Sequence, residues 1–294
     1  KFKHINSYMK NYILKINCKD KPGIISSVSN FLFKNKFNIL ESSQFRDTRN
    51  NNFFMRVHFK SIDNTIETNG INLIEKKFSS ISKKFKMNFS FYNNTKKQNI
   101  LIMVSKFGHC LNHILFQWKT NNLNVNIPCI VSNHTDMKEI VEHYGIKYEY
   151  MPISKNNKLN KEKALYTIIK KYKIDLIVLA RYMQVLSPNL CKKLQGKIIN
   201  IHHSFLPSFK GARPYHQAYK KGVKIIGATA HYVTDELDEG QIIEQDVGRV
   251  DHTKSLQDFV SMGRDIENVV LTRAIKWHIQ HRIIINKNST IVFN

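Results

Sequence analysis

The first ninety residues combine short alternating apolar and polar runs with two segments of helical periodicity. Apolar side chains recur every three or four positions between Ile24 and Leu32, which predicts one helix, and again between Leu73 and Ile81, which predicts a second. Alternation predicts strands over residues 12–18, 38–45, 53–60 and 86–92. The resulting order is βαββαβ, which is typical of a compact antiparallel sheet with its helices on one face.

From Ile100 onward the pattern changes, because the apolar runs become nearly continuous and alternate with longer helical stretches. Strands are predicted over 99–105, 126–132, 148–151, 176–180, 197–201 and 224–233, and helices near 111–120, 137–144, 161–172 and 255–281. Continuously apolar strands are buried on both faces, as in a parallel sheet wrapped by helices. We therefore predict an α/β chain with a first domain over 1–92, a polar linker over 93–99 and a second domain over 100–294, ending in an edge strand over 283–293.

The formal charge of +24 on 294 residues would by itself suggest a polyanionic partner. The lysines, however, are spread through every segment together with asparagine and isoleucine, and no nucleic-acid-binding module accompanies them. We predict no nucleic-acid partner. We expect a cytoplasmic protein for three reasons. The four cysteines are widely spaced and form no Cys-x-x-Cys pair, the sequence has no apolar run of membrane length, and it shows no signal-peptide pattern.

Candidate chemistry is concentrated at the ends of two predicted strands. Asn200, His202 and His203 lie at the end of one strand, His231 lies at the end of the next, and Asp238 lies in the loop beyond it. A carboxamide can hydrogen-bond a developing oxyanion, an imidazole can move protons near neutral pH, and a carboxylate can orient the imidazole or activate water. This set of side chains suits acyl-group chemistry.

The spacing of these residues is similar to a known family motif. The chain resembles the folate-dependent formyltransferase family, and most closely its branch that uses water as the acceptor. The resemblance rests on three motifs: Asn200-x-His202, Ser-x-Leu-Pro-x-Phe over 204–209 and Leu-Asp-x-Gly over 237–240. The resemblance implies hydrolysis of 10-formyltetrahydrofolate, a linear amide, to formate and tetrahydrofolate, supplying formate for purine synthesis and balancing folate pools. It implies no cofactor. Transfer to an amine acceptor such as glycinamide ribonucleotide is the alternative, and an amino-acid-sensing regulator with a vestigial enzyme domain is a second one.

The same resemblance assigns roles to three catalytic residues. Asn200 would hold the formyl oxygen, His202 would pass a proton to the departing folate nitrogen, and Asp238 would pair with His202 and position or deprotonate the attacking water. Taken singly, asparagine and aspartate near turns more often hydrogen-bond their own backbone. The three together, in one long motif, favour the catalytic assignment.

Further residues are predicted to line the substrate pocket. The segment after the strand over 176–180 would contact the pteridine largely through backbone groups, and polar residues of the two motif strands would complete the site. These residues are Met183, Gln184, Val185, Leu186, His203, His231, Thr234 and Asp235. His203 either places water or fixes its loop, and His216 is expected to be structural. The adjacent histidines 202 and 203 point to opposite sides of an extended chain, so no metal site is predicted.

Two other features bear on regulation and on the acceptor. Asp20-x-x-Gly23-Ile24, at the first strand–helix junction, resembles an ACT domain, which implies an amino-acid effector there or, alternatively, a purely structural or dimerising domain. The resemblance also implies a homo-oligomer. The fold class becomes an ACT-like βαββαβ domain followed by a Rossmann-like, mostly parallel formyltransferase-fold domain. In the loop over 105–111 Phe107 brings bulk where a ribonucleotide phosphate would need glycine, which favours water as the acceptor.

Overall fold

The computed structural model describes residues 11–62, 70–206 and 214–294, and the chain divides into two compact units. The first unit comprises Lys1–Lys96 together with Gln280–Ile284 and Ile291–Asn294, and the second comprises Lys97–Ile279 and Ile285–Thr290. The predicted linker over 93–99 contains this division. The carboxyl-terminal segments, which the sequence analysis placed in the second domain, are shared between the two units.

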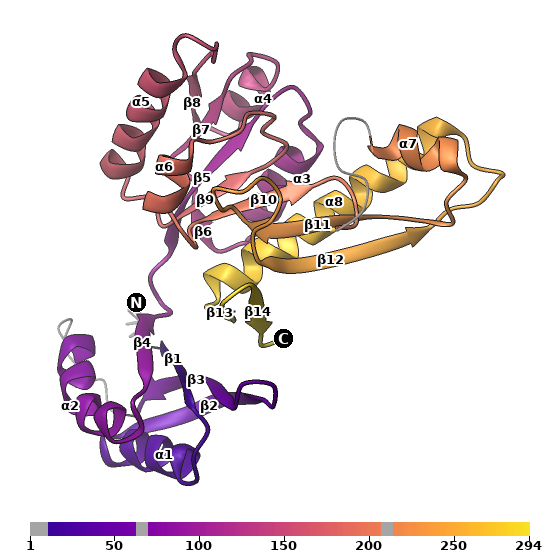
Figure 1. Cartoon of the computed structure of the whole chain (residues 1–294). Helices are drawn as coiled ribbons and strands as arrows, with labels where there is room; N and C mark the ends of the chain where they lie inside the picture. The colour runs from indigo at the N-terminus through magenta and orange to yellow at the C-terminus, as the bar shows by residue number, and fades with distance from the viewer. Residues whose placement is uncertain (1–10, 63–69, 207–213) are drawn as a thin grey trace, which may run out of the picture. The chain divides into compact units, whose positions relative to one another are not determined.

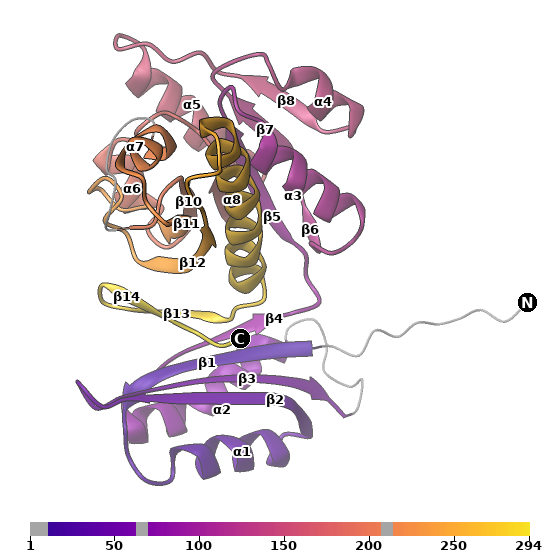
Figure 2. The same cartoon turned by 90° about the vertical axis from the view of Figure 1, so that its right-hand side faces the viewer.

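The first unit has the predicted βαββαβ order. Its elements are β1 (Asn11–Lys19), α1 (Ile24–Lys34), β2 (Phe37–Asp47), β3 (Asn52–Ser61), α2 (Gly70–Phe85) and β4 (Asn88–Asn93). The sheet has the order β2-β3-β1-β4 with every neighbouring pair antiparallel, and both helices cover one of its faces (Figure 2). Phenylalanines dominate the core between sheet and helices, where the ring of Phe78 meets those of Phe31, Phe89 and Phe91 edge-on.

The carboxyl-terminal residues of the first unit extend its core. Ile284 and Phe293 pack with Phe54 of β3, and Arg56 of the same strand donates to the carbonyl oxygen of Gln280 over 3.0 Å. The sequence predicted a single edge strand here. The structure instead forms a two-stranded sheet from β13 (Ile283–Asn286) and β14 (Ser289–Val292).

The second unit is built on a larger, mixed sheet. Its elements are β5 (Gln98–Val104), α3 (His109–Lys119), β6 (Val125–Asn126), β7 (Cys129–Ser132), α4 (Lys138–His143), β8 (Lys147–Tyr150), α5 (Lys158–Lys171), β9 (Leu176–Leu179), α6 (Pro188–Lys193), β10 (Ile198–His202), α7 (Pro214–Lys221), β11 (Ile225–Tyr232), β12 (Ile242–Arg249) and α8 (Leu256–Ile279). The strand order is β12-β11-β10-β9-β5-β7-β8, parallel from β10 to β8 and antiparallel at β11 and β12. The predicted strand over 126–132 is interrupted at Pro128, which has no backbone N–H to donate.

Helices cover both faces of this sheet (Figure 1). The long helix α8 packs against β10, β11, β12 and α3, while side chains of α5 and α6 join an apolar cluster with β5 and β9. The loops after β9 and β10 therefore open at one end of the sheet, where parallel α/β folds bind their ligands. None of the helices in the described ranges is both long and apolar enough to cross a membrane.

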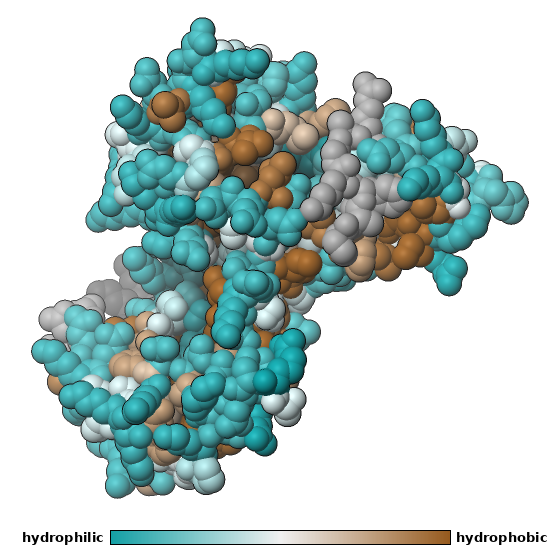
Figure 3. Space-filling view, viewed as in Figure 1, coloured by the Kyte–Doolittle hydropathy of each residue, from teal (hydrophilic) through white to brown (hydrophobic). Residues whose placement is uncertain are grey.

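Lysine and asparagine give most of the surface a hydrophilic character (Figure 3). In that view apolar side chains also gather beside α7 and the adjoining ends of β11 and β12, where Ile225 and Val247 are exposed.

Candidate active site

The candidate catalytic side chains are brought together by neighbouring strands. Asn200 and His202 alternate with Ile201 along β10, so both point to the same face of the sheet. The antiparallel neighbour β11 places His231 directly opposite Asn200 in the pairing register. Asp238 lies in the loop between β11 and β12 and has a left-handed backbone (φ 59°), a conformation that Asp and Asn adopt more readily than most residues.

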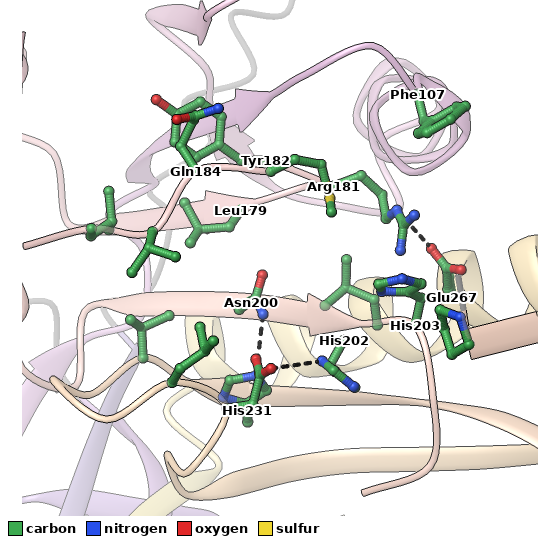
Figure 4. Close-up of a pocket in the computed structure, with 18 of the residues that line it drawn as sticks. Phe107, Leu179, Arg181, Tyr182, Gln184, Asn200, His202, His203, His231 and Glu267 are labelled. Atoms are coloured by element: carbon green, nitrogen blue, oxygen red, sulfur yellow. Dashed lines mark hydrogen bonds and ion pairs between the residues drawn. The ribbon is translucent and has the colours of Figure 1, made fainter. Parts of the chain in front are cut away.

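These four side chains form one polar network (Figure 4). His202 Nδ1 lies 3.2 Å from Asp238 Oδ2, and His231 Nε2 lies 3.6 Å from Asp238 Oδ1 and 3.2 Å from Asn200 Nδ2. The other nitrogen of each ring is also engaged, since His202 Nε2 is 2.8 Å from Ser204 Oγ and His231 Nδ1 is 2.8 Å from the Tyr232 carbonyl oxygen. Each imidazole is therefore held at both ends.

The contact with the Tyr232 carbonyl fixes the tautomer of His231. A carbonyl only accepts, so His231 Nδ1 carries a hydrogen and donates it. With the hydrogen on Nδ1, the lone pair of Nε2 can accept one N–H of Asn200 Nδ2. The Asn200 carboxamide has a second N–H that this contact does not use, and the residue lines the pocket described below.

Asp238 is a stable carboxylate in this setting. Its hydrogen bond with His202 lowers the pKa of the carboxyl far below the usual range, against the opposing effect of burial. Asp238 is therefore ionised throughout the neutral range. It can orient His202, and it can attract a proton from water held beside it.

A pocket of about 630 Å³ opens over this network. All eleven residues predicted as catalytic or substrate-binding line it: Met183, Gln184, Val185, Leu186, Asn200, His202, His203, His231, Thr234, Asp235 and Asp238. The structure thus brings together the complete predicted set. His216, which the sequence analysis treated as structural, also lines this pocket. Pro207 and residues 208–213 of the motif lie outside the described residues.

One part of the pocket was missed by the sequence analysis. Glu267 of α8 is buried at 1% exposure and accepts hydrogen bonds from Tyr215 Oη and His109 Nε2, each over 2.8 Å, while Arg181 Nε lies 3.5 Å from it. The sequence held a signal for this cluster, because Glu267 continues the buried face formed by Phe259 and Gly263 at four-residue intervals. A charge on that face predicts a buried partner.

The cluster does not favour a metal ion. Within the described ranges, His109, Cys110 and Glu267 are the one group whose ligand-type atoms lie within 4.8 Å of one another. Burial raises the pKa of the Cys110 thiol well above its usual value, so the sulfur keeps its proton. The guanidinium of Arg181 beside Glu267 also opposes a second cation.

His203 faces the space between the catalytic network and this cluster. Its ring centroid is 5.5 Å from that of His202 and 6.3 Å from that of Tyr215. Burial, reinforced by the nearby charge of Arg181, lowers the pKa of His203 to about 4. His203 is consequently neutral at physiological pH.

Comparison with known proteins agrees with this geometry. A family model described as formyl transferase matches residues 98–275, which contain the whole site. The chain belongs to the formyl transferase family. A second model, for the ACT domain, matches residues 12–69, so the chain joins an ACT domain to a formyl transferase domain as the sequence predicted.

Full-length relatives share both domains. The formyltetrahydrofolate deformylase of Bacillus subtilis is 44% identical over 96% of this chain and 93% of its own length, and that of Synechocystis is 43% identical over 95% and 97%. A crystal structure of a formyltetrahydrofolate deformylase from Pseudomonas syringae superposes with a TM-score of 0.93 at 39% identity, covering 99% of this chain and 96% of the other. A phosphoribosylglycinamide formyltransferase from Anaplasma phagocytophilum has a TM-score of 0.61 at 30% identity and covers 68% of this chain and 96% of its own.

Proposed function

We propose that this formyl transferase family member hydrolyses 10-formyltetrahydrofolate to formate and tetrahydrofolate. The observation that carries the proposal is the network of Asn200, His202 and Asp238 at one end of the sheet, facing a single pocket of about 630 Å³. The near-full-length relatives named formyltetrahydrofolate deformylase support the same chemistry.

In the proposed mechanism each polar residue has one task. The free N–H of Asn200 donates to the formyl oxygen and stabilises the charge that develops there as water attacks the carbon. Asp238 accepts the proton that the water loses and passes it to His202 across the 3.2 Å contact between them. The tetrahedral intermediate then collapses as its bond to the folate nitrogen breaks, and His202 supplies the proton that this nitrogen needs to depart.

The pteridine is assigned to the wall formed by the loop after β9. Met183 and Val185 expose 54% and 58% of their surface, which leaves apolar area for a ligand to bury. Backbone groups of Gln184 and Leu186 supply the polar contacts in this proposal. Ser105, directly after β5, fixes this loop, because the backbone N–H of Met183 donates to Ser105 Oγ over 2.9 Å.

Water is the proposed acceptor because Phe107 stands in the part of the pocket that an amine acceptor would have to enter. Phe107 lines the pocket, with the guanidinium of Arg181 5.9 Å and that of Arg264 5.6 Å from its ring centroid. Two cation–π contacts hold the aromatic ring where a phosphorylated amine would approach. The next residue, Gly108, starts α3 without space for a Cβ, which would overlap the side chain of Met137.

A competition assay separates the hydrolase from the transferase. The enzyme is incubated with 10-formyltetrahydrofolate in the presence and absence of glycinamide ribonucleotide, and formate and formylated product are both quantified. We expect formate to form at the same rate in both mixtures, with no formylated product. Faster accumulation of formylated ribonucleotide than of formate would make this chain a transferase.

For the ACT domain we propose an amino-acid effector at the β1–α1 junction and a homo-oligomer. Gly23 begins α1 with a left-handed backbone (φ 86°), and Asp20 before it pairs with Arg46 over 3.0 Å. We also propose a cytoplasmic enzyme that provides formate for purine synthesis, and its four free, buried cysteines suit a reducing compartment. Screening the proteinogenic amino acids for an effect on formate release tests the effector, and light scattering tests the oligomer.

A further inference from the structure

Arg181 presents unused hydrogen-bond donors inside the pocket that holds the catalytic network. Its side chain is only 10% exposed and lines the same pocket as Asn200 and His202. Nε and Nη1 are buried and have no hydrogen-bond partner among the described residues. Leaving guanidinium N–H groups buried without acceptors costs free energy, so such an arrangement calls for an anion from elsewhere.

The neighbouring carboxylate does not fill this need. Both oxygens of Glu267 already accept hydrogen bonds, Oε1 from Tyr215 and Oε2 from His109, and Oε2 lies 3.5 Å from Arg181 Nε. Burial acts to raise the pKa of Glu267, but the bond from His109 and the charge of Arg181 outweigh it, so the pKa lies below its usual value. Glu267 thus holds the arginine in place as a charged partner and leaves Nη1 free.

The backbone at Arg181 is held in an unfavourable conformation. Its φ of 61° is left-handed, a region where glycine fits without cost and arginine does not. The conformation is secured by Ser105, whose backbone N–H donates to the Arg181 carbonyl over 3.3 Å. It directs the side chain away from the sheet into the pocket, above His203 (Figure 4).

We infer that Arg181 forms an anion subsite that receives the formate released by hydrolysis. The inference rests on the proposed function and adds a product-binding residue to it. Formate is a small planar carboxylate, the group for which guanidinium is the best-matched partner. The ring of His203 lies 5.5 Å from that of His202 and below Arg181, and because it is neutral it adds no charge of its own between the catalytic network and the subsite (Figure 4).

The test is direct binding of ¹³C-labelled formate, followed by NMR relaxation, to the full-length chain. We expect saturable binding to the wild type and at least about tenfold weaker binding to Arg181→Gln, because a hydrogen bond to a charged group is typically worth that much. Arg264→Gln is the matched control, since it removes an equal charge from the same pocket. It should weaken formate binding much less.

A second variant leaves Arg181 in place and should change the affinity for formate in the opposite direction. Glu267→Gln keeps the shape but removes the negative charge beside the guanidinium, so formate should bind more tightly. Unchanged or weaker binding in Glu267→Gln, equal losses in the two arginine variants, or no saturable binding to the wild type would each overturn the subsite.

The rate of tetrahydrofolate formation without added formate is measured in parallel. If the wild type forms tetrahydrofolate but binds no formate, the subsite is wrong and the hydrolase stands. If it forms none, the proposed function fails while the binding result still decides whether Arg181 holds an anion.

Discussion

Replacing Asp238 with asparagine isolates the charge of the carboxylate from every other property of the residue. The volume is conserved, and asparagine tolerates the left-handed backbone at φ 59° about as well as aspartate does. Alanine would confound the result, because it would add backbone strain of about 1–2 kcal/mol at this position. Asp238→Asn is therefore the variant of choice.

The expected size of the effect follows from the contacts of Asp238. The carboxylate lies 3.2 Å from His202 Nδ1, and this interaction favours its ionised form. Asparagine can neither take up a proton from water nor stabilise a positively charged His202. General acid–base help of this kind is worth about 10²–10⁴-fold in rate, and we expect kcat to fall by that factor while KM changes little.

The assay is the initial rate of tetrahydrofolate formation, with folate binding and circular dichroism as checks on the pocket and the fold. Asp246→Asn is the control, since this aspartate pairs with Arg273 on the exposed side of β12, at 3.0 Å and outside the pocket. It should leave the rate unchanged. If Asp238→Asn kept a rate close to that of the wild type, the assignment of Asp238 and the proton path through it would be refuted.

Three further variants test residues that support the site or stabilise the first unit. Gly240→Ala should abolish activity, measured as formate release, because a Cβ there would overlap the carbonyl oxygen of Tyr232 and displace the loop that carries Asp238. His203 has a folded pKa of about 4, below its unfolded value of 6.5, so the unfolded state binds the proton first and stability falls as the pH drops between these values. From about pH 7.5 to about pH 4.5 the wild type should lose about 2.5 kcal/mol more unfolding free energy than His203→Gln, measured by denaturant titration. Deleting residues 280–294 should destabilise the first unit by about 3–6 kcal/mol through the loss of two buried apolar side chains, measured by thermal melting, whereas an unchanged transition would show that these residues are dispensable.

Local patterns were sufficient to predict most of the fold. The helix over Ile24–Lys34 and the buried strand over Leu176–Leu179 follow from apolar periodicity, and both are confirmed within one or two residues at their ends. The predicted elements are wrong where a single residue or a distant partner decides the structure. Pro128 divides one predicted strand into two, and the paired strands β13 and β14 replace the predicted edge strand.

The site could be predicted as far as its residues lie in one motif. Asn200, His202 and Asp238 are spaced as the family motif requires, and the pairing of β10 with β11 brings them together. Arg181 and Glu267 are 86 positions apart in the sequence. Their ion pair depends on how α8 crosses the sheet. No pattern within either segment specifies that crossing.

Hydrolysis in ¹⁸O-labelled water tests the central claim most directly. Purified enzyme is supplied with 10-formyltetrahydrofolate and no amine, and the formate is analysed by mass spectrometry against the tetrahydrofolate formed. Attack of water at a formyl carbon held by Asn200 and served by His202 and Asp238 predicts one formate per tetrahydrofolate, with one labelled oxygen in each formate. Formate without the label, or tetrahydrofolate that forms only when an amine acceptor is added, would contradict it.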